Sequence, residues 1–187
     1  MIKTVAFMPY RDARTLVPSS NAALIVIHEA GSAFDGSINA NGWGYYSSIG
    51  IDDAAYDIDQ IKSHGTEFNE YYEGCATKVE ALKILVMIKM IKENPNIDDL
   101  IITCKEGRSL SAAVAKFVAS SNRLELDGDT THANSLLYRL LSNPYYFDEA
   151  LETYVTPPKE KVTTKKKPKR SLFPLGWIDV LIEKIIG

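Results

Sequence analysis

Cysteine is scarce in this chain, and long apolar runs are missing from it. Of the 187 residues only Cys75 and Cys104 are cysteines, which excludes a framework of disulfides and suits a reducing compartment. No segment reaches the roughly 18 apolar residues that a membrane span needs, and the apolar stretch at the N-terminus is too short for a signal peptide. With 45% apolar residues the chain can still form a core, so we expect a globular, cytoplasmic protein.

The chain also lacks the spacings that metal ligands require. Its three histidines, His28, His64 and His132, stand far apart in the sequence. Metal sites in proteins draw on clustered or regularly spaced ligands. We therefore expect no metal site and no other cofactor.

The first 155 residues lack the net positive charge that a nucleic-acid binder would need. The net charge of -3 divides unevenly: residues 156–187 carry eight Lys/Arg against three Asp/Glu, and the preceding residues carry 13 against 21. An acidic body does not suit a polyanionic partner, so no nucleic acid is expected to bind it.

Apolar runs and helical periodicities alternate along the first 155 residues. Strands are predicted at 2–8, 22–28, about 45–51 and 99–103. Helices are predicted at 11–17, from a capping box of Thr77 and Glu80 to just before Pro95, and at 111–121, 134–141 and 145–154. The segment 52–76 is predicted to be loop with some helix. This alternation favours an α/β fold with a central, mostly parallel sheet flanked by helices.

One stretch carries the pattern of an anion-binding site. In "DLIITCKEGRSLSAAVAKF" a predicted strand ends at Cys104, a short loop contains Gly107, and a helix opens near Ser111. Backbone N–H groups and the dipole of such a helix favour an anion and a cysteine thiolate. Ser111 could cap the helix or assist the thiolate as it leaves. In parallel sheets ligands bind at the carboxyl ends of the strands, where Cys104 is expected.

This stretch resembles the signature loop of cysteine-dependent protein tyrosine and dual-specificity phosphatases, His-Cys-x-x-Gly-x-x-Arg-Ser/Thr. It is especially similar to short phage and bacterial versions, in which the loop continues into Ala-Ala-Val-Ala. The likeness extends over about residues 1–142, although only the loop is specific. It implies a phosphatase-like fold with Cys104 as nucleophile and Ser111 as its partner. It further implies a phosphate-binding loop made of Lys105, Glu106, Gly107, Arg108, Ser109 and Leu110.

Two positions depart from the family pattern. Thr103 stands in place of the histidine, and Leu110 in place of the arginine. That arginine forms a bidentate fork to phosphoryl oxygens, and losing even one such donor costs about 10²–10³ in rate. We therefore expect a catalytically impaired phosphatase-like protein that binds a phosphorylated protein or a small phosphate ligand. Two alternatives stay open: an active phosphatase that uses Arg108 through a shifted loop, and an α/β protein in which Cys104 is a small buried apolar residue.

A phosphatase of this class also needs an acid to protonate the leaving oxygen. The segment 52–59 offers four aspartates, of which the resemblance favours Asp53, with Asp52 as the next candidate. The alternative is that this segment is a solvated acidic loop. The aromatic residues of 43–46 could line a phosphotyrosine slot or pack against the body.

The C-terminal part differs in composition from the rest. We expect a phosphatase-like domain over 1–155, a basic flexible linker over 156–171 and an apolar amphipathic helix over 172–187. Such a helix must bury its apolar face. It could fold back onto the body, dock on another protein, or lie on an anionic membrane surface and so associate the protein with a membrane. In the last two cases the protein would be an adaptor that its C-terminal helix recruits to a partner or a membrane.

Overall fold

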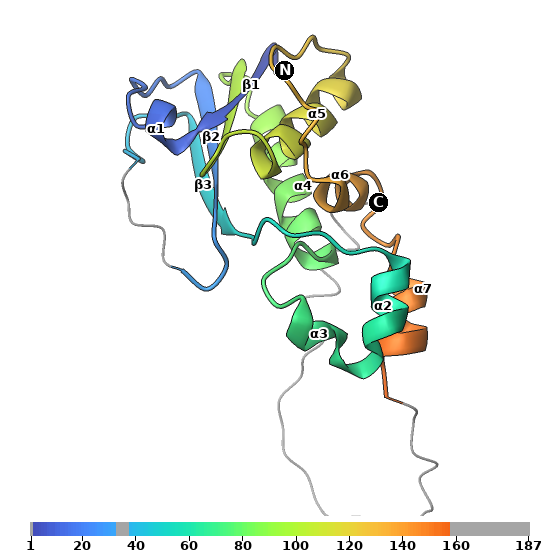
Figure 1. Cartoon of the computed structure of the whole chain (residues 1–187). Helices are drawn as coiled ribbons and strands as arrows, with labels where there is room; N and C mark the ends of the chain where they lie inside the picture. The colour runs from blue at the N-terminus through green and yellow to red at the C-terminus, as the bar shows by residue number, and fades with distance from the viewer. Residues whose placement is uncertain (1, 33–37, 158–187) are drawn as a thin grey trace, which may run out of the picture. The chain divides into compact units, whose positions relative to one another are not determined.

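The computed structural model describes residues 2–32 and 38–157. Its centre is a four-stranded, fully parallel sheet, ordered β1-β4-β2-β3 (Figure 1). The strands are β1 (Thr4–Pro9), β2 (Ala22–His28), β3 (Tyr45–Gly50) and β4 (Asp99–Cys104). Helices lie against this sheet, so the predicted α/β class is confirmed.

The helices fall close to the predicted ranges. They are α1 (Tyr10–Ala13), α2 (Ile58–His64), a 3-10 turn (Gly65–Glu67), α3 (Phe68–Tyr71), α4 (Lys78–Glu93), α5 (Leu110–Asn122), α6 (Ser135–Ser142), α7 (Asp148–Ala150) and a π-helical turn (Leu151–Val155). The capping box predicted at the start of α4 is present, with Thr77 as N-cap and Glu80 as its partner. The predicted helix at 11–17 is shorter than expected and ends at Ala13.

Alternate residues of the strands serve two apolar layers. In β2, Ile25 and Ile27 face the larger core beneath α4, α5 and α6, whereas Leu24 and Val26 face a smaller core beneath α1. Every one of these four side chains is at most 1% exposed. Because β2 is buried on both faces, its sequence is apolar throughout rather than alternating.

The acidic segment after β3 is anchored by an aromatic cluster. Tyr56 packs its ring against Phe68, Tyr72 and Phe147 at centroid distances of 4.9–5.4 Å. Its hydroxyl donates to the carbonyl of Ala76 over 3.0 Å. These contacts join the short helices α2 and α3 to α7, which lie together in Figure 1.

Within residues 2–32 and 38–157, no helix is both long enough and apolar enough to cross a bilayer. The predicted helix at 172–187 and nearly all of the predicted linker at 156–171 lie outside the described residues.

Candidate functional site

Cys104 lies at the middle of the sheet's carboxyl edge. In the parallel register it is level with Pro9 at the end of β1 and with Ile27 near the end of β2. The chain leaves β4 at Cys104, runs through residues 105–109 (the Cys104 loop) and enters α5 at Leu110. The strand–loop–helix arrangement predicted for this stretch is therefore confirmed.

The Cys104 loop packs tightly against the end of β1. Gly107 has a φ of +66°, and a Cβ atom built on it would lie 2.1 Å from the backbone nitrogen of Pro9. No other residue type fits this approach. One residue before Cys104, the fully buried Thr103 donates from Oγ1 to the carbonyl of Met8 over 2.9 Å. Thr103, which stands where the resembled family has histidine, thus joins β4 to β1.

The thiol of Cys104 faces the hydroxyl of Ser111 in the first turn of α5. Sγ and Oγ are 3.1 Å apart, and the two residues are 5% and 0% exposed. Of the two roles predicted for Ser111, helix capping is wrong, because the N-cap of α5 is Ser109. The partnership with the Cys104 sulfur agrees with the geometry.

Asp53, the predicted acid, is held beside the loop by two donors. Its Oδ1 accepts from Ser109 Oγ over 2.6 Å and from Asn134 Nδ2 over 3.0 Å. The Asn134 side chain also donates to the carbonyl of Ala54 over 3.1 Å, and its backbone N–H donates to the carbonyl of Ser109 over 3.2 Å. Three segments distant in sequence therefore meet at this carboxylate.

The other aspartates of this segment have structural contacts. Asp52 Oδ1 accepts from the backbone N–H of Ala30 over 2.8 Å, and its own backbone N–H donates to the carbonyl of Gly74. Asp57 is the N-cap of α2 and accepts from the N–H groups of Asp59 and Gln60. The structure thus favours Asp53 over Asp52 as the carboxylate nearest the Cys104 loop.

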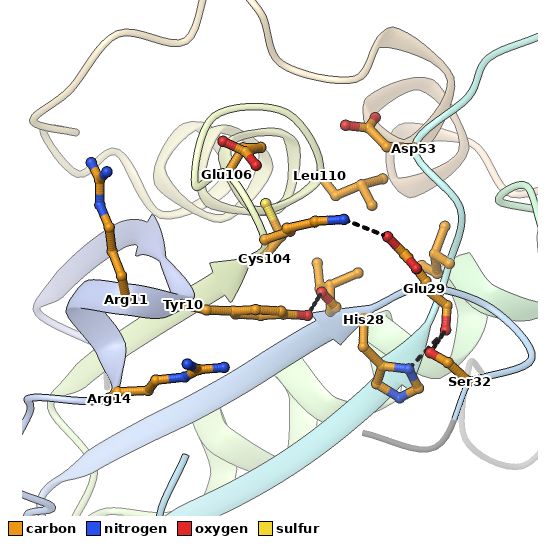
Figure 2. A pocket seen from close by; sticks show the side chains of 13 residues that line it. Tyr10, Arg11, Arg14, His28, Glu29, Ser32, Asp53, Cys104, Glu106 and Leu110 are labelled. Carbon is orange, nitrogen blue, oxygen red and sulfur yellow. Dashed lines mark hydrogen bonds and ion pairs between the residues drawn. The ribbon is translucent and has the colours of Figure 1, made fainter. Parts of the chain in front are cut away.

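A cavity of about 730 Å³ lies over Cys104 at the carboxyl edge of the sheet (Figure 2). It is bounded by α1 on one side and by the start of α5 and the segment after β3 on the other. Its lining residues are Tyr10, Arg11, Arg14, Ile27, His28, Glu29, Ser32, Ile51, Asp53, Cys104, Lys105, Glu106 and Leu110. We refer to it as the Cys104 cavity.

The structure divides the predicted phosphate-binding loop into two groups. Lys105, Glu106 and Leu110 line the cavity, and Lys105 forms an ion pair with Glu29 over 2.9 Å. This hydrogen-bonded pair raises the pKa of Lys105 above its ordinary value. The remaining predicted members, Gly107, Arg108 and Ser109, are not among the lining residues.

Arg108 is exposed at the surface of the loop. An arginine that replaces the family residue would have to reach into the cavity. The observed geometry therefore gives no support to the alternative in which Arg108 takes the place of the absent arginine at position 110.

Several lining residues were not predicted. Tyr10 and Arg11 belong to α1, directly after β1, and Arg14 follows the end of α1. His28 is the last residue of β2, and Glu29 follows it. Carboxyl ends of parallel strands share an edge, and this rule applied to the first two strands would have pointed to them. The hydroxyl of Tyr10 donates to the carbonyl of Ile27, which places the Tyr10 ring across the cavity (Figure 2).

The aromatic residues of 43–46 do not line the Cys104 cavity. Trp43 and Tyr46 pack against the smaller core and Tyr45 against the larger one. Of their two predicted roles, packing against the body agrees with the structure.

Among the residues described, no group of three or more His, Cys, Asp or Glu side chains is placed to hold a metal ion. No family model, curated protein or solved structure matches this chain.

Proposed function

We propose that the chain is a phosphatase-like protein whose Cys104 cavity binds the phosphoryl group of a phosphorylated ligand or partner, with little or no hydrolysis. The observation that carries this proposal is the Cys104–Ser111 contact of 3.1 Å at the base of the cavity. A thiol at the end of a central strand, a tight glycine loop and a hydroxyl in the following turn form the arrangement that the resembled phosphatases need.

The local electrostatics support an anion at this place. The Cys104 loop opens the 13-residue α5, whose first N–H groups and dipole favour negative charge beside Cys104. The close approach of Gly107 to Pro9 keeps the loop in one position. An anion site of this kind costs little reorganisation when the ligand enters.

Leu110 is the reason to expect weak catalysis. It lines the cavity, is only 4% exposed and belongs to the larger core, so an apolar side chain occupies the place of the family arginine. A leucine offers no donors to the oxygens of a transferring phosphoryl group. The loss of such donors lowers the rate of the chemical step by at least about 10²–10³.

An active cysteine phosphatase is the second candidate, and the position of Asp53 at the cavity favours it. In that reaction the Cys104 thiolate attacks phosphorus, the S–P bond forms as the P–O bond breaks, and protonated Asp53 gives its proton to the leaving oxygen. Water then attacks phosphorus and returns a proton to Asp53, the S–P bond breaks, and phosphate leaves. The hydroxyl of Ser111 would donate to the departing sulfur.

Hydrolysis of a small aryl phosphate by full-length wild type, Cys104→Ser and Leu110→Arg tests the proposal, with Cys75→Ser as a matched control. We expect negligible turnover by wild type and at least about a hundredfold gain in Leu110→Arg. Turnover by wild type and Cys75→Ser that is lost in Cys104→Ser would establish the second candidate instead. If no variant turns over or binds an aryl phosphonate, the proposal is wrong.

A further inference from the structure

Lys105 is the cationic residue that directly follows Cys104 in the chain. Among the described lining residues of the Cys104 cavity, the lysines and arginines are Arg11, Arg14 and Lys105. Figure 2 shows the side chains of Arg11 and Arg14 pointing away from each other, with Tyr10 between Arg14 and Cys104. The two arginines therefore do not converge on Cys104, and Lys105 is the cation to consider beside it.

The sheet register brings Glu29 to Lys105. The interior strands β2 and β4 are neighbours, and Ile27 is level with Cys104. Lys105 is the next residue after Cys104, and Glu29 is the second residue after Ile27. Lys105 Nζ and Glu29 Oε1 are 2.9 Å apart, and both residues line the cavity. This ion pair therefore joins the ends of the two interior strands next to Cys104.

The main chain at Glu29 is held by its neighbours, but its side chain is not. The carbonyl of Glu29 accepts from the hydroxyl of Ser32 over 2.7 Å, and the N–H of Ala30 donates to Asp52 Oδ1 over 2.8 Å. The side chain of Glu29 is 66% exposed. The carboxylate can therefore leave Lys105 and enter solvent while the main chain stays in place.

The Lys105–Glu29 pair is easily exchanged. The Lys105 side chain is 70% exposed, and an ion pair between two such exposed side chains contributes little to stability. While the pair is formed, however, the carboxylate offsets the charge of the ammonium group. An anion that enters the cavity gains the full charge of Lys105 only if it takes the place of Glu29.

We propose that Lys105 recognises the phosphoryl group in the Cys104 cavity and that Glu29 is its internal competitor, which the ligand displaces. This inference rests on the proposed function. An ammonium group binds phosphate oxygens as a compact point charge. An anion bound to Lys105 beside Cys104 would also meet the first N–H groups of α5, which Glu29 does not replace. Glu29 thus sets the affinity of the cavity without touching the bound ligand.

Binding of phenylphosphonate, a non-hydrolysable aryl phosphonate, to the full-length protein tests this inference by titration calorimetry at low salt. We expect Glu29→Gln to tighten binding by about threefold to fivefold, and Lys105→Gln to weaken it by about as much. Glu152→Gln, at an exposed glutamate outside the cavity, removes the same charge and is the matched control, which should bind as wild type does. Melting curves verify that each variant is folded.

The double variant separates competition from simple repulsion. If Glu29 acts by occupying Lys105, Glu29→Gln should have almost no effect on binding once Lys105 is glutamine. After displacement the Glu29 carboxylate lies in solvent, where its charge is screened. An equal gain from Glu29→Gln with and without Lys105 would mean that Glu29 only repels the ligand, and the inference would be wrong.

The remaining outcomes distinguish this inference from the proposed function. If wild type binds phenylphosphonate and Glu29→Gln binds it no more tightly, the inference is wrong while the proposed function stands. If Leu110→Arg binds but wild type and Glu29→Gln do not, the inference is again wrong. If none of these proteins binds, the proposed function itself fails, and the inference fails with it.

Discussion

Ser109 Oγ donates to Asp53 Oδ1 over 2.6 Å, and the two residues are separated by 56 positions in the sequence. Asn134 Nδ2 donates to the same oxygen over 3.0 Å. The predicted acid is thus fixed by groups that sit outside the cavity. Changes to these groups should alter the stability and position of Asp53 without removing any lining residue.

Asn134→Asp should destabilise the protein more than Asn134→Ser. Both variants keep an oxygen that can cap α6, where Asn134 Oδ1 accepts from the N–H of Leu137 over 2.9 Å. The aspartate, however, turns a donor 3.0 Å from Asp53 into a second negative charge. We expect a loss of about 2 kcal/mol for Asp and about 1 kcal/mol for Ser in urea denaturation. Equal losses would show that a negative charge at position 134 is not repelled by Asp53.

Gly107→Ala should cost far more than Gly31→Ala. Both glycines have a left-handed φ, +66° and +70°, so both substitutions pay a conformational penalty of about 1–2 kcal/mol. Gly31 has open space around it, whereas a Cβ on Gly107 would lie 2.1 Å from the nitrogen of Pro9. Gly107→Ala should therefore lose more than about 3 kcal/mol, or displace the loop and abolish phosphonate binding. Similar melting temperatures for the two variants would contradict the packing described here.

Cys75 should be unreactive at neutral pH. Burial raises the pKa of its thiol, and the negative charge of Asp52 raises it further. Because the folded state favours the neutral thiol, this contribution to stability is full below the ordinary pKa of 9.0 and is lost as the pH rises through the raised value. Alkylation by iodoacetamide of Cys104→Ser, in which Cys75 is the remaining cysteine, should have its midpoint above 9.0 when folded. The urea-unfolded protein is the control, and a native midpoint at or below the unfolded one would refute the expectation.

Tyr56→Phe should lower the free energy of unfolding by about 1–2 kcal/mol. The substitution keeps the ring packing against Phe68 and removes a hydroxyl that satisfies the carbonyl of Ala76, which is left buried without that donor. Tyr145→Phe, at a residue 49% exposed, is the matched control and should change stability by less than about 0.5 kcal/mol. Urea denaturation of both variants measures the difference; a neutral Tyr56→Phe would mean that the carbonyl finds another donor.

The sequence predicted the strands and helices of this fold better than it predicted which of them lie side by side. The strand at 22–28 was predicted with its observed ends, because a strand buried on both faces is apolar throughout. Cys104 was predicted at the carboxyl edge because it follows a predicted strand of a parallel sheet. Periodicity does not reveal which strands pair, however, and the β1–β4 pairing is what places Arg11 and Arg14 at the cavity.

Side-chain contacts between segments distant in the sequence could not be predicted from sequence patterns either. Asn134 is the first residue of a predicted helix, which indicates a cap, but no pattern indicates its bond to Asp53 across 81 positions. Asp53 was chosen through the resemblance. The structure favours it over Asp52 because Asp53 lines the cavity and accepts from Ser109, whereas Asp52 accepts from the backbone of Ala30.

The strand order has a consequence for biosynthesis. β4 is the last of the four strands to leave the ribosome, yet it occupies an interior position, between β1 and β2. In the described sheet β1 pairs with β4. The backbone groups of β1 therefore have no strand partner until some 90 further residues have been synthesised. A nascent chain can assemble β2 with β3 early, while β1 stays exposed to chaperones or to other unpaired edges. The Cys104 cavity, which needs both β1 and β4, is therefore completed only when residue 110 has left the ribosome.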